Sequence, residues 1–246
     1  MIFKKEYSKI YNQIYKKKNY IKETNYIVAL LKKNKILKKN ILEFGLGTGN
    51  HAKYLIKKNY NVVGVEKSSD MLRFAKTIPK LKCILGDIRN IRLNKKFDAI
   101  LSLFHVINYM LTNSDINNFF KTANVHLENN GLLVFDTWND KAVKIGQLFE
   151  NKFFKINHYD IEKISCSKNK IKKKIITINF KFVVKKKGKI INNFLEKHTI
   201  RYFSFKEICY FANKNNFKLI HNYNMLTFSK PLKNDKNSCY VFRKLY

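Results

Sequence analysis

Three glycines alternate with other residues in the segment ILEFGLGTGN (41–50), at Gly45, Gly47 and Gly49. A buried strand that ends in a glycine-rich turn and continues as a helix is how α/β proteins hold nucleotide-like cofactors. The spacing is G-x-G-x-G, whereas NAD-binding proteins have G-x-G-x-x-G. An acid, Glu43, precedes the loop, where it would repel a pyrophosphate but attract a cationic group. The segment therefore indicates a cofactor with a cationic end; an ordinary strand–turn–helix is the simpler alternative.

Acids also follow the next two apolar runs. Glu66 ends the run NVVGVE (61–66), 23 residues after Glu43. This interval is close to the roughly 20 residues at which α/β cofactor folds place the acid that binds ribose hydroxyls. Asp87 follows the short run 82–85, although Gly-Asp is also common in turns. The pattern predicts several acids near one ligand at the ends of neighbouring strands.

In this order, the motifs resemble those of class I S-adenosylmethionine-dependent methyltransferases, whose first motif is an acid followed by G-x-G-x-G. The resemblance implies S-adenosylmethionine as the cofactor, ribose hydroxyls on Glu66 and the adenine amino group on Asp87, and no metal. It also implies contacts from side chains beside the motifs. The expected cofactor-binding set is Tyr15, Glu43, Gly45, Gly47, Gly49, Asn50, Glu66, Lys67, Met71, Asp87, Ile88 and Leu103. By spacing alone, Met71 is more often a core residue than a cofactor contact; the resemblance brings the two alternatives close to even.

The acceptor side is predicted around the segment SLFHVINY (102–109), because the ends of strands in an open α/β sheet face the ligand crevice. An amine has to be uncharged to attack a methyl group, and His105 is placed to remove its proton. A structural histidine is the alternative. Asn108, Tyr109 and the single tryptophan, Trp138, are expected to contact the substrate.

The N-terminal segment carries tyrosines at positions 7, 11 and 15, which share one helical face. The stripe can simply pack against the core. The segment also resembles the N-terminus of small-molecule N-methyltransferases, most closely those that dimethylate nucleotide-linked amino sugars. There, an aromatic face can attract a sulfonium or ammonium cation. The resemblance implies a catalytic and substrate-contacting role for Tyr11 and a cofactor contact for Tyr15.

The element pattern predicts an α/β fold with a Rossmann-like seven-stranded sheet, mostly parallel, with the last strand antiparallel. We expect a helix over 114–127 capped by Ser114 and a helix over 201–215 capped by Ser204. The resemblance implies a structural role for His126 at the end of the first of these helices. Residues 149–200 alternate apolar and polar, which predicts antiparallel strands with a turn at Lys187-Gly188. The resemblance implies a helical cap over the cofactor (1–36), the cofactor-binding core (37–140), a β insertion that forms a substrate platform (141–200) and the completion of the core sheet (201–246).

The formal net charge of +33 would ordinarily suggest a polyanionic partner. However, 45 of the 50 basic residues are lysine, spread along the chain, whereas arginine is preferred for phosphate and base recognition. Drift in an A/T-rich genome explains the lysines together with the abundant Asn, Ile, Phe and Tyr. The chain lacks the N/D-P-P-Y/F motif of adenine methyltransferases and the cysteine nucleophile of cytosine enzymes. We therefore expect a small-molecule amine substrate, with only nonspecific polyanion binding.

The remaining composition is that of a cytoplasmic protein. Four dispersed cysteines without C-x-x-C argue against a zinc site or a disulfide framework. The sequence has neither an apolar run long enough to cross a membrane nor a secretory signal, and it leaves room for a homodimer. Two alternatives stay open: an RNA or protein methyltransferase that uses the lysine-rich surface, and a non-catalytic relative that only binds the cofactor. The acceptor, N- versus O-methylation and the number of methyl groups are not determined.

Overall fold

The computed structural model describes residues 3, 5–143, 147–156 and 158–246 of the 246-residue chain. The chain forms two compact units, each built from two separate stretches of sequence. The smaller unit combines 1–18 with 144–201, and the larger combines 19–143 with 202–246. The N-terminal 36 residues are thus shared between the units. Their expected role as a cover over the cofactor stays a prediction.

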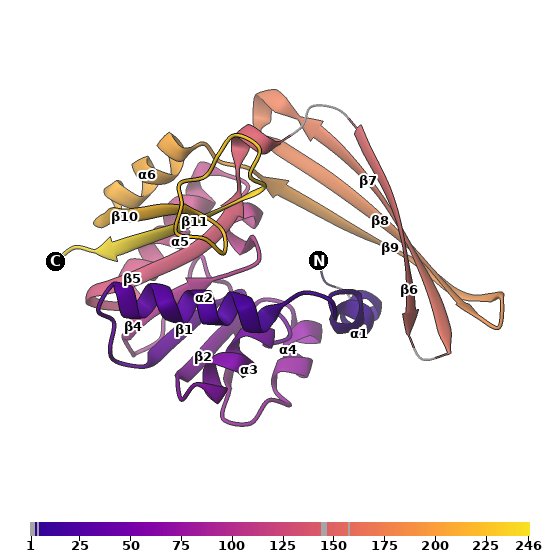
Figure 1. Ribbon diagram of the computed structural model, residues 1–246, viewed down its shortest axis with the longest axis horizontal. Coiled ribbons are helices and arrows are strands. Elements are labelled where there is room, and N and C mark those ends of the chain that lie inside the picture. The colour runs from indigo at the N-terminus through magenta and orange to yellow at the C-terminus, as the bar shows by residue number, and fades with distance from the viewer. Residues whose placement is uncertain (1–2, 4, 144–146, 157) are drawn as a thin grey trace. The chain divides into compact units, whose positions relative to one another are not determined.

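The larger unit is organised around one seven-stranded sheet (Figure 1), in the order β10-β11-β5-β4-β1-β2-β3. The strand β11 is antiparallel to both of its neighbours, and the other adjacent pairs are parallel. This confirms the predicted fold class. From β1 the chain proceeds outward through β2 and β3, and then returns to the other side of β1 as β4. Such a reversal leaves a crevice at the carboxyl ends of the central strands, where open α/β sheets bind ligands. The strands are β1 (Asn40–Phe44), β2 (Asn61–Glu66), β3 (Lys82–Leu85), β4 (Phe97–Ser102), β5 (Leu127–Trp138), β10 (Phe217–Asn224) and β11 (Asn237–Lys244).

Helices cover both faces of this sheet, because its strands are apolar on both sides. Leu42 and Phe44 of β1 join the core with α5 (Asn113–His126) and α6 (Phe205–Lys214). Ile41 points to the opposite core, with α2 (Tyr20–Lys33), α3 (Asn50–Lys57) and α4 (Ser69–Ala75). The carboxyl ends of the buried strands β1, β2 and β4 are therefore held between two packed layers. Short 3-10 helices occur at η1 (Val106–Tyr109), η2 (Asp140–Ala142) and η3 (Ile171–Lys173).

The helix boundaries confirm Ser204 as an N-cap and correct one prediction. The side chain of Ser204 caps α6, although that helix begins at Phe205, later than expected. The prediction that Ser114 caps α5 is wrong: Thr112 is the N-cap, and it forms a capping box with Asp115. The Thr112 hydroxyl accepts the Asp115 N–H, and the Asp115 carboxylate accepts the Thr112 N–H. Two backbone donors at the start of the helix are thereby satisfied.

His126 has the structural role predicted for it. Its Nδ1 donates to the Thr122 carbonyl oxygen at 2.8 Å, and its Nε2 accepts the Leu93 N–H at 2.7 Å. Burial lowers its pKa, so the ring stays neutral in this arrangement. The imidazole joins the end of α5 to the turn before β4.

The smaller unit is a four-stranded antiparallel meander with one helix against it (Figure 1). The predicted turn at Lys187-Gly188 is confirmed, with positive φ at both residues, as two-residue hairpins favour. Tyr7 on α1 (Lys5–Ile14) is buried, and its ring centroid lies 5.5 Å from that of Phe182 and 5.7 Å from that of His198. The tyrosine stripe therefore packs on the sheet. The strands are β6 (Gln147–Ile156), β7 (Tyr159–Lys170), β8 (Ile175–Lys186) and β9 (Lys189–Arg201).

Within residues 3, 5–143, 147–156 and 158–246, none of the helices is long and apolar enough to cross a membrane. Within the same ranges, no cluster of three or more His, Cys, Asp and Glu side chains is arranged to hold a metal ion.

Candidate active site

The glycine loop connects β1 to α3 at the crevice edge of the sheet. Gly45, Gly47 and Gly49 all have positive φ, at 70°, 59° and 78°. A Cβ on Gly45 would lie 2.5 Å from a Val106 methyl carbon, so packing alone requires glycine there. A Cβ on Gly47 would meet only the Met71 methyl carbon, at 3.7 Å. The space beside Gly47 is thus nearly open, as expected where a backbone approaches a ligand.

Glu66 connects this loop to the end of β2. Its side chain is buried; Oε2 accepts the Gly47 N–H and Oε1 accepts the Ser68 N–H, each at 2.8 Å. Burial raises the pKa of Glu66, while the backbone donors act in the opposite direction. The Lys67 N–H is a third backbone donor to this carboxylate. Because its two oxygens together accept about four hydrogen bonds, Glu66 retains capacity for a ligand hydroxyl.

Glu43 lies at the other side of the loop and is more deeply buried, with 2% of its surface exposed. Burial raises its pKa to about 7; nearby His51 favours the charged form, whereas Glu66 disfavours it. Within the described part of the chain, its Oε2 has no hydrogen-bond partner. A buried carboxylate oxygen without a donor is costly unless a cationic group pairs with it. The open space at Gly47 and this oxygen together fit a cofactor that carries an ammonium group.

Asp87 follows β3 and is held by two cations. Arg89 donates to it through Nε at 2.9 Å and Nη2 at 2.6 Å, as well as through its backbone N–H, and Lys67 Nζ donates at 2.8 Å. The Arg89 hydrogen bonds keep the pKa of Asp87 well below its usual range. Each carboxylate oxygen already accepts two bonds, so an adenine amino group would have to displace one donor. Lys67, with a side chain 70% exposed, is the most easily displaced.

The other predicted cofactor residues lie close to the loop or within the core. Asn50 begins α3 and donates to the Thr48 hydroxyl at 3.0 Å. The side chain of Met71 is buried beside the loop, and Ile88 and Leu103 are buried in the cores on opposite faces of the sheet. Burial gives these three side chains a packing role, and their contact with a cofactor stays a prediction.

His105 lies just beyond the end of β4 in a strained turn. Phe104 and His105 both have left-handed φ angles, at 67° and 63°. Such strain in non-glycine residues persists where the surroundings impose it, and it is common at functional sites. The His105 N–H donates to Asp136 Oδ1 at 3.2 Å. Its ring Nε2 lies 3.0 Å from Asn237 Oδ1 and 3.3 Å from Asp136 Oδ2. Because both neighbours are acceptors, Nε2 carries the proton and Nδ1 is the basic nitrogen.

Of the predicted substrate residues on the larger unit, Trp138 lies beside His105, whereas Asn108 and Tyr109 are packed into the protein. The Trp138 ring lies 6.1 Å from the His105 ring in an edge-on arrangement, so the structure brings these two together. Asn108 is fully buried, and its Oδ1 accepts the Thr137 hydroxyl at 3.1 Å. Tyr109 is partly buried against the core. Asn108 thus anchors the turn beneath His105, and substrate contact would require that turn to open.

Tyr11 and Tyr15 belong to the smaller unit. Their ring centroids lie 4.7 Å apart, and burial raises the pKa of Tyr15. Beside them, Lys163 is buried with Nζ 5.9 Å from the Tyr15 ring and 4.1 Å from the Phe180 ring. Burial lowers the pKa of Lys163 to about 8. The rings of Tyr15 and Phe180 thus accommodate the ammonium group of Lys163. The roles predicted for Tyr11 and Tyr15 at the active site stay predictions.

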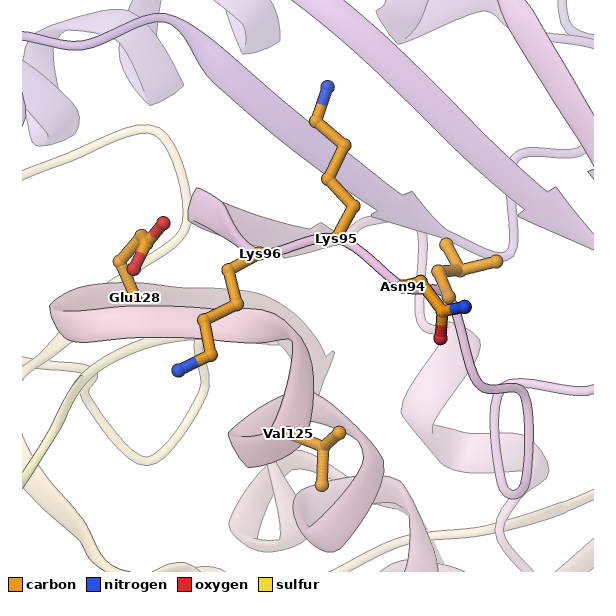
Figure 2. Close-up of a pocket in the computed structure, with 6 residues that line it drawn as sticks. Asn94, Lys95, Lys96, Val125 and Glu128 are labelled. Carbon is orange, nitrogen blue, oxygen red and sulfur yellow. The ribbon is translucent and has the colours of Figure 1, made fainter.

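A separate pocket lies at the opposite edge of the larger sheet (Figure 2), lined by the turn before β4 and by the junction of α5 with β5. Figure 2 shows Lys95 and Lys96 projecting in opposite directions from this turn. The polar groups do not converge, so the pocket is not a candidate for catalysis.

Sequence reasoning missed several residues of the site. Arg89, Asp136 and Asn237 bond to predicted site residues, and Glu23 bonds to His51 near Glu43. The signal for Asp136 was available, since it is an acid near the end of the apolar run of β5, at the crevice edge. Asn237 is 132 positions from His105, and no local pattern connects them.

Comparisons with known proteins agree with this geometry. Residues 41–131 match the family model described as a methyltransferase domain. Over 140 residues the chain is 29% identical to dTDP-3-amino-3,4,6-trideoxy-alpha-D-glucopyranose N,N-dimethyltransferase of Streptomyces venezuelae, covering 56% of this chain and 59% of that protein. It is 26% identical over 136 residues to dTDP-3-amino-3,6-dideoxy-alpha-D-glucopyranose N,N-dimethyltransferase of Streptomyces fradiae, covering 54% and 53%. The chain therefore matches between about half and three fifths of the length of these two relatives.

Solved structures extend the likeness in fold. Streptomyces venezuelae DesVI superposes with a TM-score of 0.84 at 21% identity, covering 99% of this chain and 100% of that one. CalS10, an amino pentose methyltransferase from Micromonospora echinaspora, gives 0.80 at 18% identity, covering 99% and 98%. Residues 41–131 thus match a methyltransferase domain, and the chain has the fold of these solved methyltransferases. Its matched domain contains the glycine loop, the acids at the ends of β1 and β2, Asp87 and His105.

Proposed function

We propose that this chain transfers a methyl group from S-adenosylmethionine to the amine nitrogen of a small molecule, an amino sugar linked to a nucleotide. The observation that carries the proposal is the combination of an intact glycine loop and its acids with an antiparallel sheet inserted after β5. That insertion lies within a likeness to DesVI and CalS10 that covers at least 98% of each chain. The names of both curated relatives describe N,N-dimethylation of dTDP-linked amino sugars, which supports this acceptor class.

The cofactor supplies a methyl carbon made electrophilic by a sulfonium. Glu66 would hold the ribose hydroxyls, since its oxygens retain acceptor capacity after bonding to Gly47 and Ser68. Glu43 would receive the ammonium group at its unpaired Oε2. Asp87, held as a carboxylate by Arg89, would accept the adenine amino group in place of Lys67. Together these residues fix the direction in which the methyl group is presented, and alignment contributes a large part of such a rate.

His105 would remove the proton from the acceptor. An amine is largely protonated near neutral pH, and the nitrogen of the resulting ammonium group has no lone pair for attack. Because Nε2 is engaged by Asn237 and Asp136, the proton would go to Nδ1. The buried Asp136 carboxylate, 3.3 Å from Nε2, would then stabilise the imidazolium.

The test is to incubate the purified chain with S-adenosylmethionine and a panel of acceptors, and to follow the demethylated cofactor and the acceptor mass. We expect a nucleotide-linked amino sugar to gain one or two methyl groups, and the corresponding sugar with a hydroxyl in place of the amine to gain none. Methylation of the hydroxyl sugar, or of RNA alone, would contradict the proposal.

A further inference from the structure

Three ionisable side chains from three elements of the larger unit form a line that ends at the glycine loop. Glu23, in the first turn of α2, lies with Oε2 2.6 Å from Nε2 of His51 on α3. His51 Nδ1 in turn lies 3.8 Å from Oε1 of Glu43. The side chains of Glu23, His51 and Glu43 are 13%, 7% and 2% exposed. A histidine between two carboxylates, shielded from water, can hold a proton at either nitrogen.

The contact with Glu23 sets the tautomer of the neutral His51 ring. At 2.6 Å, a carboxylate oxygen of Glu23 can only accept, so Nε2 carries the hydrogen and Nδ1 has the lone pair that faces Glu43. The 3.8 Å gap to Glu43 is longer than a hydrogen bond, and an approach of about 1 Å or one bridging water would close it. The edge of the Tyr20 ring also packs on the imidazole, with centroids 5.1 Å apart.

Glu43 needs such a partner, because its charged form is disfavoured before a ligand arrives. Its other charged neighbour is Glu66, whose carboxylate opposes a second negative charge nearby. Burial raises the pKa of Glu43 to about 7, so the proton-bearing and charged forms coexist near neutrality. An ammonium group would pair with the charged form alone.

We propose that Glu23 and His51 are positioning residues that take up the proton of Glu43 when the ammonium group of the cofactor docks at its Oε2. In this step the O–H bond of Glu43 breaks and an N–H bond forms at His51 Nδ1. The Glu23 carboxylate stabilises the resulting imidazolium. The three residues thereby exchange a proton internally rather than with solvent. This inference rests on the proposed function only in taking Glu43 as the residue that meets the cofactor's ammonium group.

The consequence is a cofactor affinity that changes little with pH. With the relay intact, binding moves a proton within the protein and releases almost none. Without it, Glu43 has to release its proton to solvent. The Glu43 pKa of about 7 includes the lowering effect of His51, so without His51 it lies higher and binding at pH 7 would release at least about half a proton per cofactor. By the same linkage, affinity would fall at least about fivefold between pH 7 and pH 6.

Calorimetry with two ligands tests the relay. S-adenosylhomocysteine carries the ammonium group, whereas methylthioadenosine lacks the amino-acid end and serves as the control ligand. Titrations at pH 6 and pH 7, in two buffers with different ionisation enthalpies, give both affinity and the number of protons exchanged. We would compare the wild type with His51→Gln, Glu23→Gln and His158→Gln, the last being an exposed histidine of the smaller unit.

For S-adenosylhomocysteine, we expect almost no proton release by the wild type and by His158→Gln. We expect at least about half a proton released at pH 7 by His51→Gln, with an at least roughly fivefold pH dependence of affinity, and a shift in the same direction for Glu23→Gln. Methylthioadenosine should show neither effect in any variant. Release of half a proton by the wild type would overturn the relay, even if the variants failed to fold, and so would identical proton counts in His51→Gln and wild type. Failure of both ligands to bind the wild type would instead refute the cofactor assignment itself.

Discussion

Arg89→Ala is the substitution whose cost can be worked out most directly from the contacts. Its guanidinium holds Asp87 through Nε and Nη2, and its Nη1 lies 2.6 Å from Oδ1 of Asp115. Asp115 closes the capping box of α5 with Thr112, at 3.0 Å in both directions. One side chain therefore joins the exit of β3 to the start of α5.

Hydrogen bonds to charged groups contribute about 1.5–3 kcal/mol each, but they are not additive. The Arg89 side chain is 33% exposed, so solvent screening reduces its ion pairs. We therefore expect Arg89→Ala to lower the free energy of unfolding by about 2–3 kcal/mol in total. For a chain of this size, that corresponds to a fall in Tm of roughly 4–12 °C. Arg73→Ala is the matched control: its ion pair with Asp70 is 3.4 Å long, its guanidinium lies 6.0 Å from the Phe74 ring centroid, and its side chain is 58% exposed, so we expect less than about 0.5 kcal/mol.

The pH dependence of the free energy of unfolding gives a second test of the Arg89 contacts. The Arg89 hydrogen bonds lower the pKa of Asp87; at Asp115 burial acts to raise the pKa, but the bonds to Arg89 and Thr112 outweigh it. Carboxyls with lowered folded-state pKa values add stability above their unfolded pKa of about 3.9, and lose it as the pH falls through the folded values. Urea unfolding at pH 7, 5 and about 3 should show the gap between wild type and Arg89→Ala narrowing at the lowest pH. Equal stability of Arg89→Ala and Arg73→Ala at pH 7, or a gap that stays constant to pH 3, would refute the reasoning.

Three further substitutions or conditions test the site. Glu66→Ala should weaken S-adenosylhomocysteine binding by about 1–3 kcal/mol in calorimetry, since buried donors lose their acceptor. The control Glu128→Gln, at the far edge of the sheet, should leave this binding unchanged. NAD should not bind to the wild type. His105→Ala should lower kcat on the order of 10²-fold at pH 7, with cofactor affinity little changed and a smaller loss where the amine deprotonates by itself; an unchanged kcat from pH 6 to 9 would make the histidine structural. Activity on a small amine should survive at about 0.3 M salt, where phosphate-driven association is largely lost; site-specific RNA methylation without small-amine turnover would instead support the nucleic-acid alternative. The homodimer also stays a prediction, which light scattering of the purified chain checks.

The sequence was sufficient for the features that local patterns encode. Apolar runs ending in glycine or an acid predicted the parallel strands and placed Glu43 and Glu66 beside the loop. The hairpin at Lys187-Gly188 followed from glycine chemistry in the same way. The error at Ser114 is instructive, because Thr112 and Asp115 already had the spacing of a capping box. Thr112 and Ser114 were both candidates for the N-cap. Only Thr112 has an acid three positions later, which completes a capping box.

Contacts between distant segments could not be predicted. His51 and Glu23 are 28 positions apart on different helices, and only the packing of α2 on α3 brings them together. Arg89 reaches Asp115 across a similar separation. Ion pairs of this kind depend on side-chain directions set by the fold, for which hydrophobic periodicity gives no signal. The assignment of 1–18 to the same unit as 144–201 is of the same kind.

The smaller unit combines residues 1–18 with residues 144–201, and this separation in sequence has a consequence for biosynthesis. Tyr7 contacts Phe182 and His198, which follow it by about 175 and 190 positions. At about 5–20 residues per second, a ribosome takes roughly 10–40 s to deliver these strands after α1 has emerged. Throughout that interval the tyrosine face of α1 lacks the sheet that later covers it. Nascent chains would therefore gain from a chaperone that shields the N-terminus, and a slow-translating expression host, which prolongs this interval, would yield more aggregate than a fast one.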